Sequence, residues 1–271
     1  MKICIAGKNS IAVNSLNFLL NVLKIERKNL LACINKNDNG IDTWQPSFLN
    51  YCKNENIKIV ELEYLYNLKD LIFISLEYDR ILKVNKFSNK KLFNIHFSLL
   101  PKYKGMYTSI LPILYGEKES GVTLHKIDDG IDTGDIIDQL KFKIDLKDTA
   151  RDVYFKYLKY GYKLFIKNIK NILEDKYIVK PQSPINSTYF SKSSIDFQNI
   201  IINLIQTSYQ IHNQIRAYIF EEYQLPKINN IYIKRSILLD EKINSNYYED
   251  YEKYIIISGI DGYKIILEKK Q

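Results

Sequence analysis

Several features that mark particular classes of protein are missing from this sequence. The longest apolar runs, such as Leu71 to Leu76, are far shorter than the roughly 20 residues that a membrane-spanning helix requires. The opening segment, Met1 to Gly7, is too short for the apolar region of a secretory signal and suits a strand followed by a turn. The sequence therefore predicts a cytoplasmic protein that has no membrane partner.

Cysteines and cofactor-binding motifs are also scarce. Cys4, Cys33 and Cys52 fit no paired metal spacing, which predicts buried free thiols. The first turn holds one glycine, Gly7, where dinucleotide binding needs three in a GxGxxG pattern, and no GxxxxGK[ST] phosphate loop occurs. The acidic stretch 128–135 lacks the ligand pattern of a calcium loop, and three histidines without cysteine pairs offer little to zinc. We expect no nicotinamide cofactor and no metal.

The positive charge of the chain has two interpretations. The 271 residues have a net charge of +8 and a pI of about 9.0, which suits a polyanionic partner such as RNA. The excess is nearly all lysine, spread thinly among many Asn, Ile and Tyr residues, as a codon bias would produce. We therefore expect no nucleic-acid partner and keep a basic RNA-binding protein without catalysis as an alternative.

Apolar runs alternate with helical patterns through the first two thirds of the chain. Strands are predicted at residues 2–6, 30–35, 57–60, 71–75, 92–95, 121–126 and 136–142, and helices at 11–23, 43–55, 109–115 and 149–173. Asn9 or Ser10 is placed to cap the first helix. This alternation implies an α/β domain with a mostly parallel sheet covered on both faces. We assign it to residues 1–180.

A smaller C-terminal α+β domain is predicted over residues 181–271. Pro181 and Pro184, with polar neighbours such as Gln182, suit a linker or a domain edge. Helices are expected at residues 194–205 and 208–215, and β-rich runs at 228–237, 254–258 and 263–267.

Three polar side chains are candidates for chemistry. Asn94 and His96 are two residues apart on a predicted strand and so share one face, and Asp132 lies in a turn bracketed by glycines. Acyl transfer to an amine needs a base and donors to the oxyanion, which His96 and Asn94 could supply while Asp132 orients His96. Without a nucleophile elbow, direct attack by the amine is the natural route. Each residue also has a structural explanation: a core histidine, a strand-end turn residue and an Asx turn.

The sequence around these residues carries a family resemblance. The stretches NIHFSLLPKYKG at 94–105, GVTLH at 121–125 and GIDTGD at 130–135 closely resemble the 10-formyltetrahydrofolate-dependent formyltransferases. The resemblance implies a Rossmann-like formyltransferase domain with N10-formyltetrahydrofolate as the formyl donor. It also implies that Asn94, His96 and Asp132 are catalytic, with His96 as the base, Asn94 and His96 holding the oxyanion, and Asp132 supporting proton transfer.

The resemblance implies two further sets of contacts. The pterin would lie against mainly main-chain groups of two segments, whose residues are Tyr78, Arg80, Ile81, Leu82, Ile127, Asp128 and Gly130. Arg80 could equally be a surface charge. The first turn matches the place where glycinamide ribonucleotide formyltransferases bind substrate phosphate, which implies acceptor contacts by Lys8, Asn9 and Ser10. A helix N-terminus favours such an anion.

The formyl acceptor is also suggested by resemblance. Residues 105–114 lack the proline-and-tryptophan pattern of methionyl-tRNA formyltransferases and resemble sugar N-formyltransferases that act on dTDP-linked 3-amino-3,6-dideoxyhexoses. Residues 187–190, 194–197, 215–218 and 223–226 resemble the same branch. Within them, Arg216 is a candidate contact for the diphosphate, and Tyr218 or Tyr223 could stack on thymine, although a chain with 22 tyrosines places many by chance. The expected role is lipopolysaccharide or O-antigen sugar synthesis, with a homodimer as the family expectation. A methionyl-tRNA formyltransferase stays as an alternative.

Overall fold

The computed structural model describes residues 1–270, which group into two compact units. Unit 1 comprises Met1–Gly105, Gly121–Lys141 and Tyr157–Tyr189, and unit 2 comprises Met106–Ser120, Phe142–Lys156 and the chain from Phe190 onward. Each unit is built from three segments, so no single position divides them. The division into domains at residue 180 stays a prediction.

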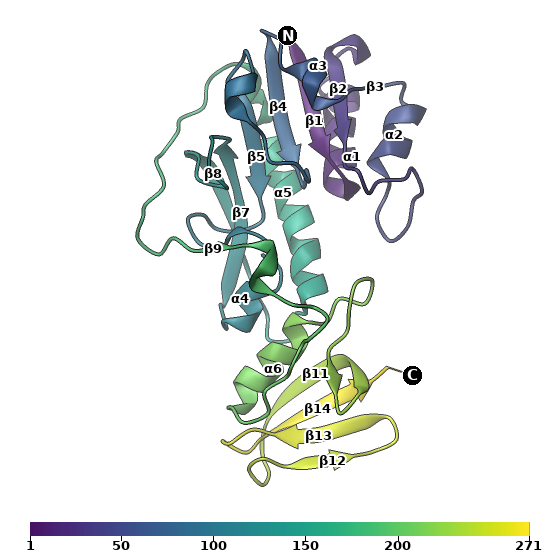
Figure 1. Cartoon of the computed structure of the whole chain (residues 1–271), viewed down its shortest axis with the longest axis vertical. Coiled ribbons are helices and arrows are strands. Elements are labelled where there is room, and N and C mark those ends of the chain that lie inside the picture. Colours follow the sequence, from purple (N-terminus) through teal and green to yellow (C-terminus); the bar gives the residue numbers. More distant parts are fainter. Residues whose placement is uncertain (271) are drawn as a thin grey trace. The chain divides into compact units, whose positions relative to one another are not determined.

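The sheet of unit 1 has the strand order β3-β2-β1-β4-β5-β7-β8 (Figure 1). The strands are β1 (Lys2–Gly7), β2 (Leu30–Ile34), β3 (Lys58–Ile59), β4 (Leu71–Leu76), β5 (Leu92–His96), β7 (Glu119–Lys126) and β8 (Ile136–Lys143). The first five of these pair in parallel, and β7 runs antiparallel to β5. Every residue of β4 is buried, as expected of a strand covered on both faces. The predicted α/β fold with a mostly parallel sheet is confirmed.

Helices α1 (Asn9–Asn17), α2 (Phe48–Asn54), α3 (Leu62–Leu65) and most of α5 (Ala150–Leu173) belong to unit 1. A π-helical turn (Phe18–Val22) continues α1, and short 3-10 helices lie at Arg27–Asn29 and Val84–Lys86. Tyr157 of α5 stacks on Phe97 with 5.2 Å between ring centroids. A Cβ at Gly161 would lie 2.7 Å from the Ile11 side chain, so α5 packs closely on α1. No helix described in residues 1–270 is both long and apolar enough to cross a membrane.

Two details at the helix starts of unit 1 differ from prediction. The N-cap of α1 is Lys8, without a side-chain bond, because the Asn9 amide donates to Glu77 Oε2 at 3.3 Å. The expectation that Asn9 or Ser10 caps this helix is therefore wrong. Helix α2 begins five residues later than predicted, because the Ser47 hydroxyl accepts from the amide of Asn50 and so sets the first turn there.

The strand order places a topological switch point between β1 and β4. The chain runs outward from β1 to β2 and β3, then returns to β4 on the other side of β1. The carboxyl ends of these two strands approach closely, since a Cβ at Gly7 would lie 1.9 Å from the Leu76 carbonyl oxygen. Sheets of this kind bind ligands at the carboxyl ends of strands beside such a point.

Unit 2 contains an antiparallel sheet with the order β10-β11-β14-β13-β12. Its strands are β10 (Lys227–Ile228), β11 (Ile231–Lys242), β12 (Tyr248–Asp250), β13 (Tyr254–Ser258) and β14 (Tyr263–Lys269), and its helices are α4 (Leu111–Leu114) and α6 (Ser208–Ala217). Ile211 and Ile215 of α6 share a buried cluster with isoleucines of the sheet. The two-stranded pair β6 (Lys104–Gly105) and β9 (Tyr189–Phe190) completes the strands described.

The predicted β-rich run 228–237 is confirmed, with a turn inside it, since Asn229 and Asn230 both adopt positive φ and connect β10 to β11. The predicted helix over residues 194–205 is wrong. Residues 195–206 form no helix, because short polar side chains bond to nearby backbone instead. Asp196 Oδ1 accepts from the amide of Gln198, and Asn203 Oδ1 accepts from that of Ile205, both at 2.9 Å.

Candidate functional site

The site begins at the antiparallel pairing of β5 and β7. Asn94 of β5 lies directly opposite His125 of β7, and His96 lies opposite Thr123. Because side chains two residues apart point to the same face of a strand, Asn94 and His96 face the same side as predicted. The register adds His125, which no expectation from the sequence included.

Asp132 reaches these residues from the loop after β7. It adopts φ +55°, a left-handed conformation that an aspartate tolerates better than most side chains. Gly134 beside it has no room for a side chain, since a Cβ there would lie 1.8 Å from the Lys126 carbonyl oxygen. The turn therefore needs glycine where the sequence has it, and it aims a short carboxylate at the end of β5.

The carboxylate of Asp132 brings the predicted trio together. Its Oδ2 accepts from the Gly105 amide at 2.8 Å and lies 3.5 Å from His96 Nδ1. Its Oδ1 accepts from Asn94 Nδ2 at 3.3 Å and lies 3.6 Å from His125 Nε2. Asn94, His96 and Asp132 thus lie within one hydrogen-bonding cluster.

Backbone carbonyls determine where the two histidines carry their protons. The Tyr103 carbonyl accepts from His96 Nε2 at 2.8 Å, so neutral His96 is protonated there and its Nδ1 is the basic atom facing Asp132. The Lys126 carbonyl accepts from His125 Nδ1 at 2.7 Å, which leaves His125 Nε2 to accept from Asn94 Nδ2 at 3.1 Å. His125 thereby orients the Asn94 amide.

The pKa values of the pair reflect burial and attraction. Burial lowers the pKa of His96, which is 8% exposed, while the charge of Asp132 and the bond to Tyr103 oppose that shift. For Asp132, burial raises the pKa, but His96, His125 and the Gly105 amide outweigh it and hold the pKa well below its usual range. Near neutral pH the site thus pairs an ionised carboxylate with a neutral imidazole.

Gln182 supports the Asp132 loop, although the sequence suggested only a linker. Its Nε2 donates to the carbonyl oxygens of Asp132 and Gly134, both at 2.8 Å. These two bonds connect the backbone at Asp132, which has the left-handed conformation, with the backbone at Gly134, and they stabilise the turn. Gln182 Oε1 is buried and accepts no bond among residues 1–270.

The loop that follows His96 is fixed by Thr123, which is fully buried. The Thr123 hydroxyl donates to the Ser98 carbonyl at 2.7 Å and accepts from the Leu100 amide at 3.1 Å. Gln139 Nε2 of β8 donates to the same hydroxyl at 2.8 Å. The segment leading to Tyr103 and Gly105 is therefore anchored to β7 and β8.

The two segments predicted to contact folate lie on one part of unit 1. Tyr78, Leu82 and Ile127 pack on the same buried cluster around Phe73, and the Ile127 amide donates to the Leu92 carbonyl at 2.8 Å. The remaining predicted residues are more exposed: Ile81 projects outward, Arg80 pairs with Glu61 at 3.2 Å, and Asp128 accepts from Gly130 and Thr133. Arg80 is thus an ion-paired, half-buried residue, and its Nε is buried without a partner among residues 1–270.

The predicted acceptor residues divide between the units. Lys8, Asn9 and Ser10 lie at the carboxyl end of β1, beside the switch point, where the Ser10 amide donates to Gln45 Oε1 at 3.1 Å. Arg216, Tyr218 and Tyr223 lie in unit 2. Their predicted nucleotide contacts stay predictions.

Local packing differs among the three residues of unit 2. Arg216 is 2% exposed and donates to backbone carbonyls of its own unit. Tyr218 is half-buried, and burial raises the pKa of its hydroxyl. Tyr223 is 62% exposed, with its ring 4.8 Å from that of Phe220.

Comparison with known proteins gives a consistent picture. Residues 63–169 match the family model of the formyl transferase. The methionyl-tRNA formyltransferase of Fervidobacterium nodosum is 30% identical over 238 residues, which cover 80% of this chain and 71% of that protein.

Two solved structures are more similar still. WlaRD, a sugar 3N-formyl transferase solved with dTDP and 5-N-formyl-THF, is 57% identical with a TM-score of 0.97, covering 99% of this chain and 97% of that one. An N-formyltransferase from Helicobacter canadensis, solved with folinic acid and dTDP-3-aminofucose, is 55% identical with a TM-score of 0.97 over the full length of both chains.

We predict that Asp132→Asn lowers the pKa of His96 further. Asparagine tolerates the left-handed backbone but removes the negative charge that opposes the effect of burial, so the pKa of His96 should fall. Titration of the His96 imidazole by NMR measures the change, with Asp240→Asn on exposed β11 as the matched loss of charge. An unchanged His96 pKa would contradict the proposed pairing.

We also predict that Gln182→Met loosens the Asp132 loop. The variant keeps the side-chain length but leaves two backbone carbonyls unpaired, which should cost about 1–3 kcal/mol in the free energy of unfolding. Hydrogen exchange at the Gly105 amide, which donates to Asp132, should accelerate. Gln198→Met, at an exposed position, serves as the control and should change neither quantity. Equal Gly105 exchange in the wild type and both variants would show that Gln182 does not hold the loop.

Proposed function

Because the chain belongs to the formyltransferase family, we propose that it moves a formyl group from N10-formyltetrahydrofolate to the amine of a dTDP-linked 3-amino-3,6-dideoxyhexose. The observation that carries this proposal is the similarity to WlaRD and to the Helicobacter canadensis enzyme, which extends over both units at 55–57% identity. The match to the methionyl-tRNA formyltransferase is weaker, at 30% identity. The sugar acceptor is therefore favoured over the tRNA acceptor.

In this proposal His96 is the general base. The sugar amine attacks the formyl carbon, and the proton that it releases passes to His96 Nδ1, the ring nitrogen that faces Asp132. The ionised Asp132 stabilises the imidazolium formed in this step, at a distance of 3.5 Å between His96 Nδ1 and Asp132 Oδ2. Cleavage of the bond between the formyl carbon and N10 then returns a proton to N10, so that atoms and charge balance.

Asn94 is proposed to stabilise the developing oxyanion. Its Nδ2 makes two contacts, one with His125 at 3.1 Å and a longer one with Asp132 at 3.3 Å. The hydrogen in the longer contact is the one that can turn to the formyl oxygen, while His125 keeps the amide oriented. A preorganised donor of this kind is worth about 10²–10³ in kcat in other enzymes.

The remaining site assignments belong to the same proposal. The folate would lie on the segments 78–82 and 127–130, which share one buried cluster. Lys8, Asn9 and Ser10 would contact the acceptor at the switch point of the sheet. We propose a cytoplasmic location, since both substrates are metabolites of that compartment, and a homodimeric assembly as in the family expectation. The product would serve lipopolysaccharide or O-antigen sugar synthesis.

We predict that the purified chain releases tetrahydrofolate when given N10-formyltetrahydrofolate and a dTDP-3-amino-3,6-dideoxyhexose. Mass spectrometry should show the N-formylated sugar nucleotide in equal amount. The same assay with a UDP-linked amino sugar tests recognition of the nucleotide. Release with methionyl-tRNA and with no dTDP-linked amino sugar would overturn the proposal, and release without any amine would indicate hydrolysis of the donor.

We predict that Asn94→Ala and His96→Asn each lower kcat by about 10²–10⁴, with smaller changes in KM, because both groups act in the transition state. The activity of the wild type should fall as pH decreases through the lowered pKa of His96, since only the neutral imidazole accepts a proton. Asp132→Asn should move this acid limb to lower pH. Asp240→Asn is the control, and full activity of His96→Asn would exclude the assigned base.

A further inference from the structure

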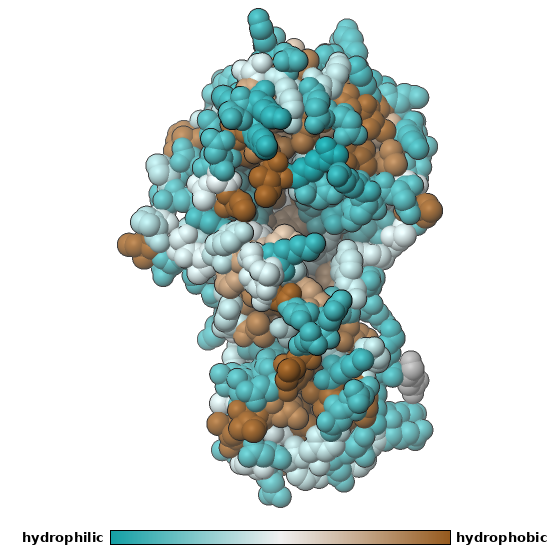
Figure 2. Space-filling view, in the orientation of Figure 1, coloured by the Kyte–Doolittle hydropathy of each residue, from teal (hydrophilic) through white to brown (hydrophobic). Residues whose placement is uncertain are grey.

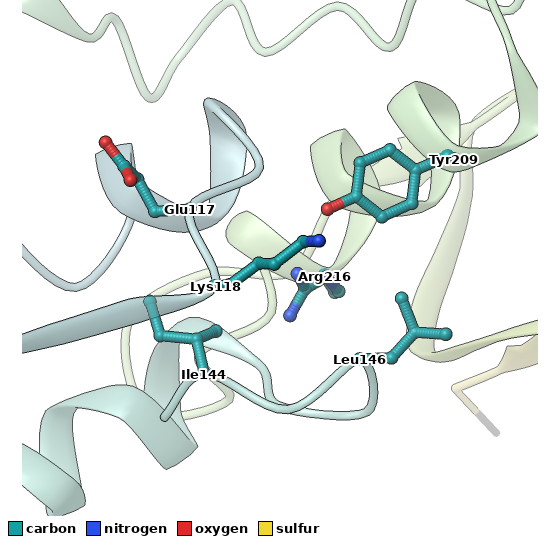
Figure 3. Close-up of a pocket in the computed structure, with 6 residues that line it drawn as sticks. All are labelled: Glu117, Lys118, Ile144, Leu146, Tyr209 and Arg216. Atoms are coloured by element: carbon teal, nitrogen blue, oxygen red, sulfur yellow. The ribbon is translucent and has the colours of Figure 1, made fainter. Parts of the chain in front are cut away.

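Unit 2 contains an open cavity of about 190 Å³ that takes no part in the formyl-transfer step (Figure 3). Arg216, a predicted contact of the acceptor diphosphate, lines this cavity, so the inference drawn from it rests in part on the proposed function. The cavity lies between the approach to β7, the connection from β8 to α5, and helix α6. Its lining residues are Glu117, Lys118, Ile144, Leu146, Tyr209 and Arg216. The backbone around it is tied together, since the Ile144 amide donates to the Lys118 carbonyl at 2.9 Å and the Tyr209 hydroxyl donates to the Gly116 carbonyl at 3.3 Å.

Arg216 is held rigidly at the base of this cavity. Its Nε donates to Asn213 Oδ1 at 2.9 Å, and its Nη1 donates to the carbonyls of Asp145 and Asp148 at 3.1 and 2.7 Å. These bonds are to neutral oxygens, and the Nη2 amino group takes part in none of them. The guanidinium is thus fixed in orientation without a direct hydrogen bond to a carboxylate, although the charge of Asp148 attracts it.

Two carboxylates near Arg216 form ion pairs with another lysine. Asp145 and Asp148 both bond to the Lys156 ammonium. Glu117 projects away from the cavity in Figure 3, whereas Lys118 extends toward Arg216 and the Tyr209 hydroxyl. The ion pairs found among residues 1–270 include neither Lys118 nor Arg216. Two cationic side chains, Lys118 and Arg216, therefore line the same cavity.

An anion bound between two cationic side chains in a partly desolvated cavity is attracted by both of them. Arg216 supplies a preorganised hydrogen-bond donor, and Lys118 supplies an ammonium on a flexible side chain. Together they can bind the oxygens of a phosphate group. We propose that Arg216 and Lys118 form an oxyanion-binding site that takes a phosphate or diphosphate group.

The volume and surroundings limit what the site can hold. A cavity of 190 Å³ is below the roughly 300 Å³ at which pockets take drug-sized ligands, so it suits a phosphate group and not a whole nucleotide. A second cavity of about 490 Å³ shares Lys118, Ile144 and Leu146 with it. The phosphate group of a larger ligand could therefore enter the first cavity while its remainder lies over these two apolar side chains.

The test uses the full chain and follows the Arg216 Nε–H signal by NMR, because this buried, hydrogen-bonded group reports locally. Titration with inorganic phosphate should shift the signal and saturate, whereas sodium chloride at equal ionic strength should not. In Lys118→Met the half-saturating concentration should rise about tenfold or more, since a charge-assisted contact is lost. Lys234→Met, an exposed lysine of β11, should leave it unchanged.

Each outcome of the titration decides the proposal. No saturable shift with phosphate, or the same affinity in Lys118→Met as in the wild type, would overturn it. The titration follows an NMR signal in unit 2 and involves no turnover. Its result is therefore independent of the result of the formyl-transfer assay. Arg216→Lys, which keeps the charge but loses the fork of donors, should also weaken binding if it retains the wild-type fold by NMR.

The source of the phosphate group is distinguished by two further titrations. Half-saturation by dTDP at a much lower concentration than by inorganic phosphate indicates that the site takes the diphosphate of a nucleotide. Equal or weaker binding of dTDP indicates a site for free phosphate. Both results support an oxyanion site of the proposed composition.

Discussion

The buried carboxylate of Asp132 is the interaction on which the candidate site depends. A charge in this environment is costly unless it is paired and hydrogen-bonded. Here His96, Asn94, His125 and the Gly105 amide all face it. Side chains of β5 and β7 and the backbone of Gly105 therefore converge on one side chain. Figure 2 shows that hydrophilic and hydrophobic residues both appear on the visible face of the molecule. In the proposed function, the folate and the acceptor both bring their reacting atoms to the cluster around Asp132.

Much of the fold could be predicted from the sequence, because strands buried on both faces are continuous apolar runs. The run from Leu71 to Leu76 is the clearest case, since all six residues are buried in β4. The candidate site was partly predictable for a different reason. Strand alternation places Asn94 and His96 on one face, but their convergence with Asp132 was expected only from the family resemblance, since a distance along the chain says nothing about a distance in space.

The rest depends on tertiary structure. His125 joins the site through the register of two antiparallel strands, and Gln182 lies in a proline-flanked polar segment that is typical of a linker. Residues 195–206 have helical spacing but use their Asp and Asn side chains to bond local backbone. In each case the position of the residue depends on which atoms pair with it in the folded chain. Spacing along the sequence does not identify those atoms.

The threonine at the centre of β7 has a consequence for the rigidity of the segment that follows His96. Three hydrogen bonds at the Thr123 hydroxyl join β8 to the backbone at Ser98 and Leu100. The conformational entropy of this segment is therefore lost when the protein folds and need not be lost again when a ligand arrives. A ligand that bound against this segment would meet backbone that already has its final conformation, so more of its contact energy would remain for affinity.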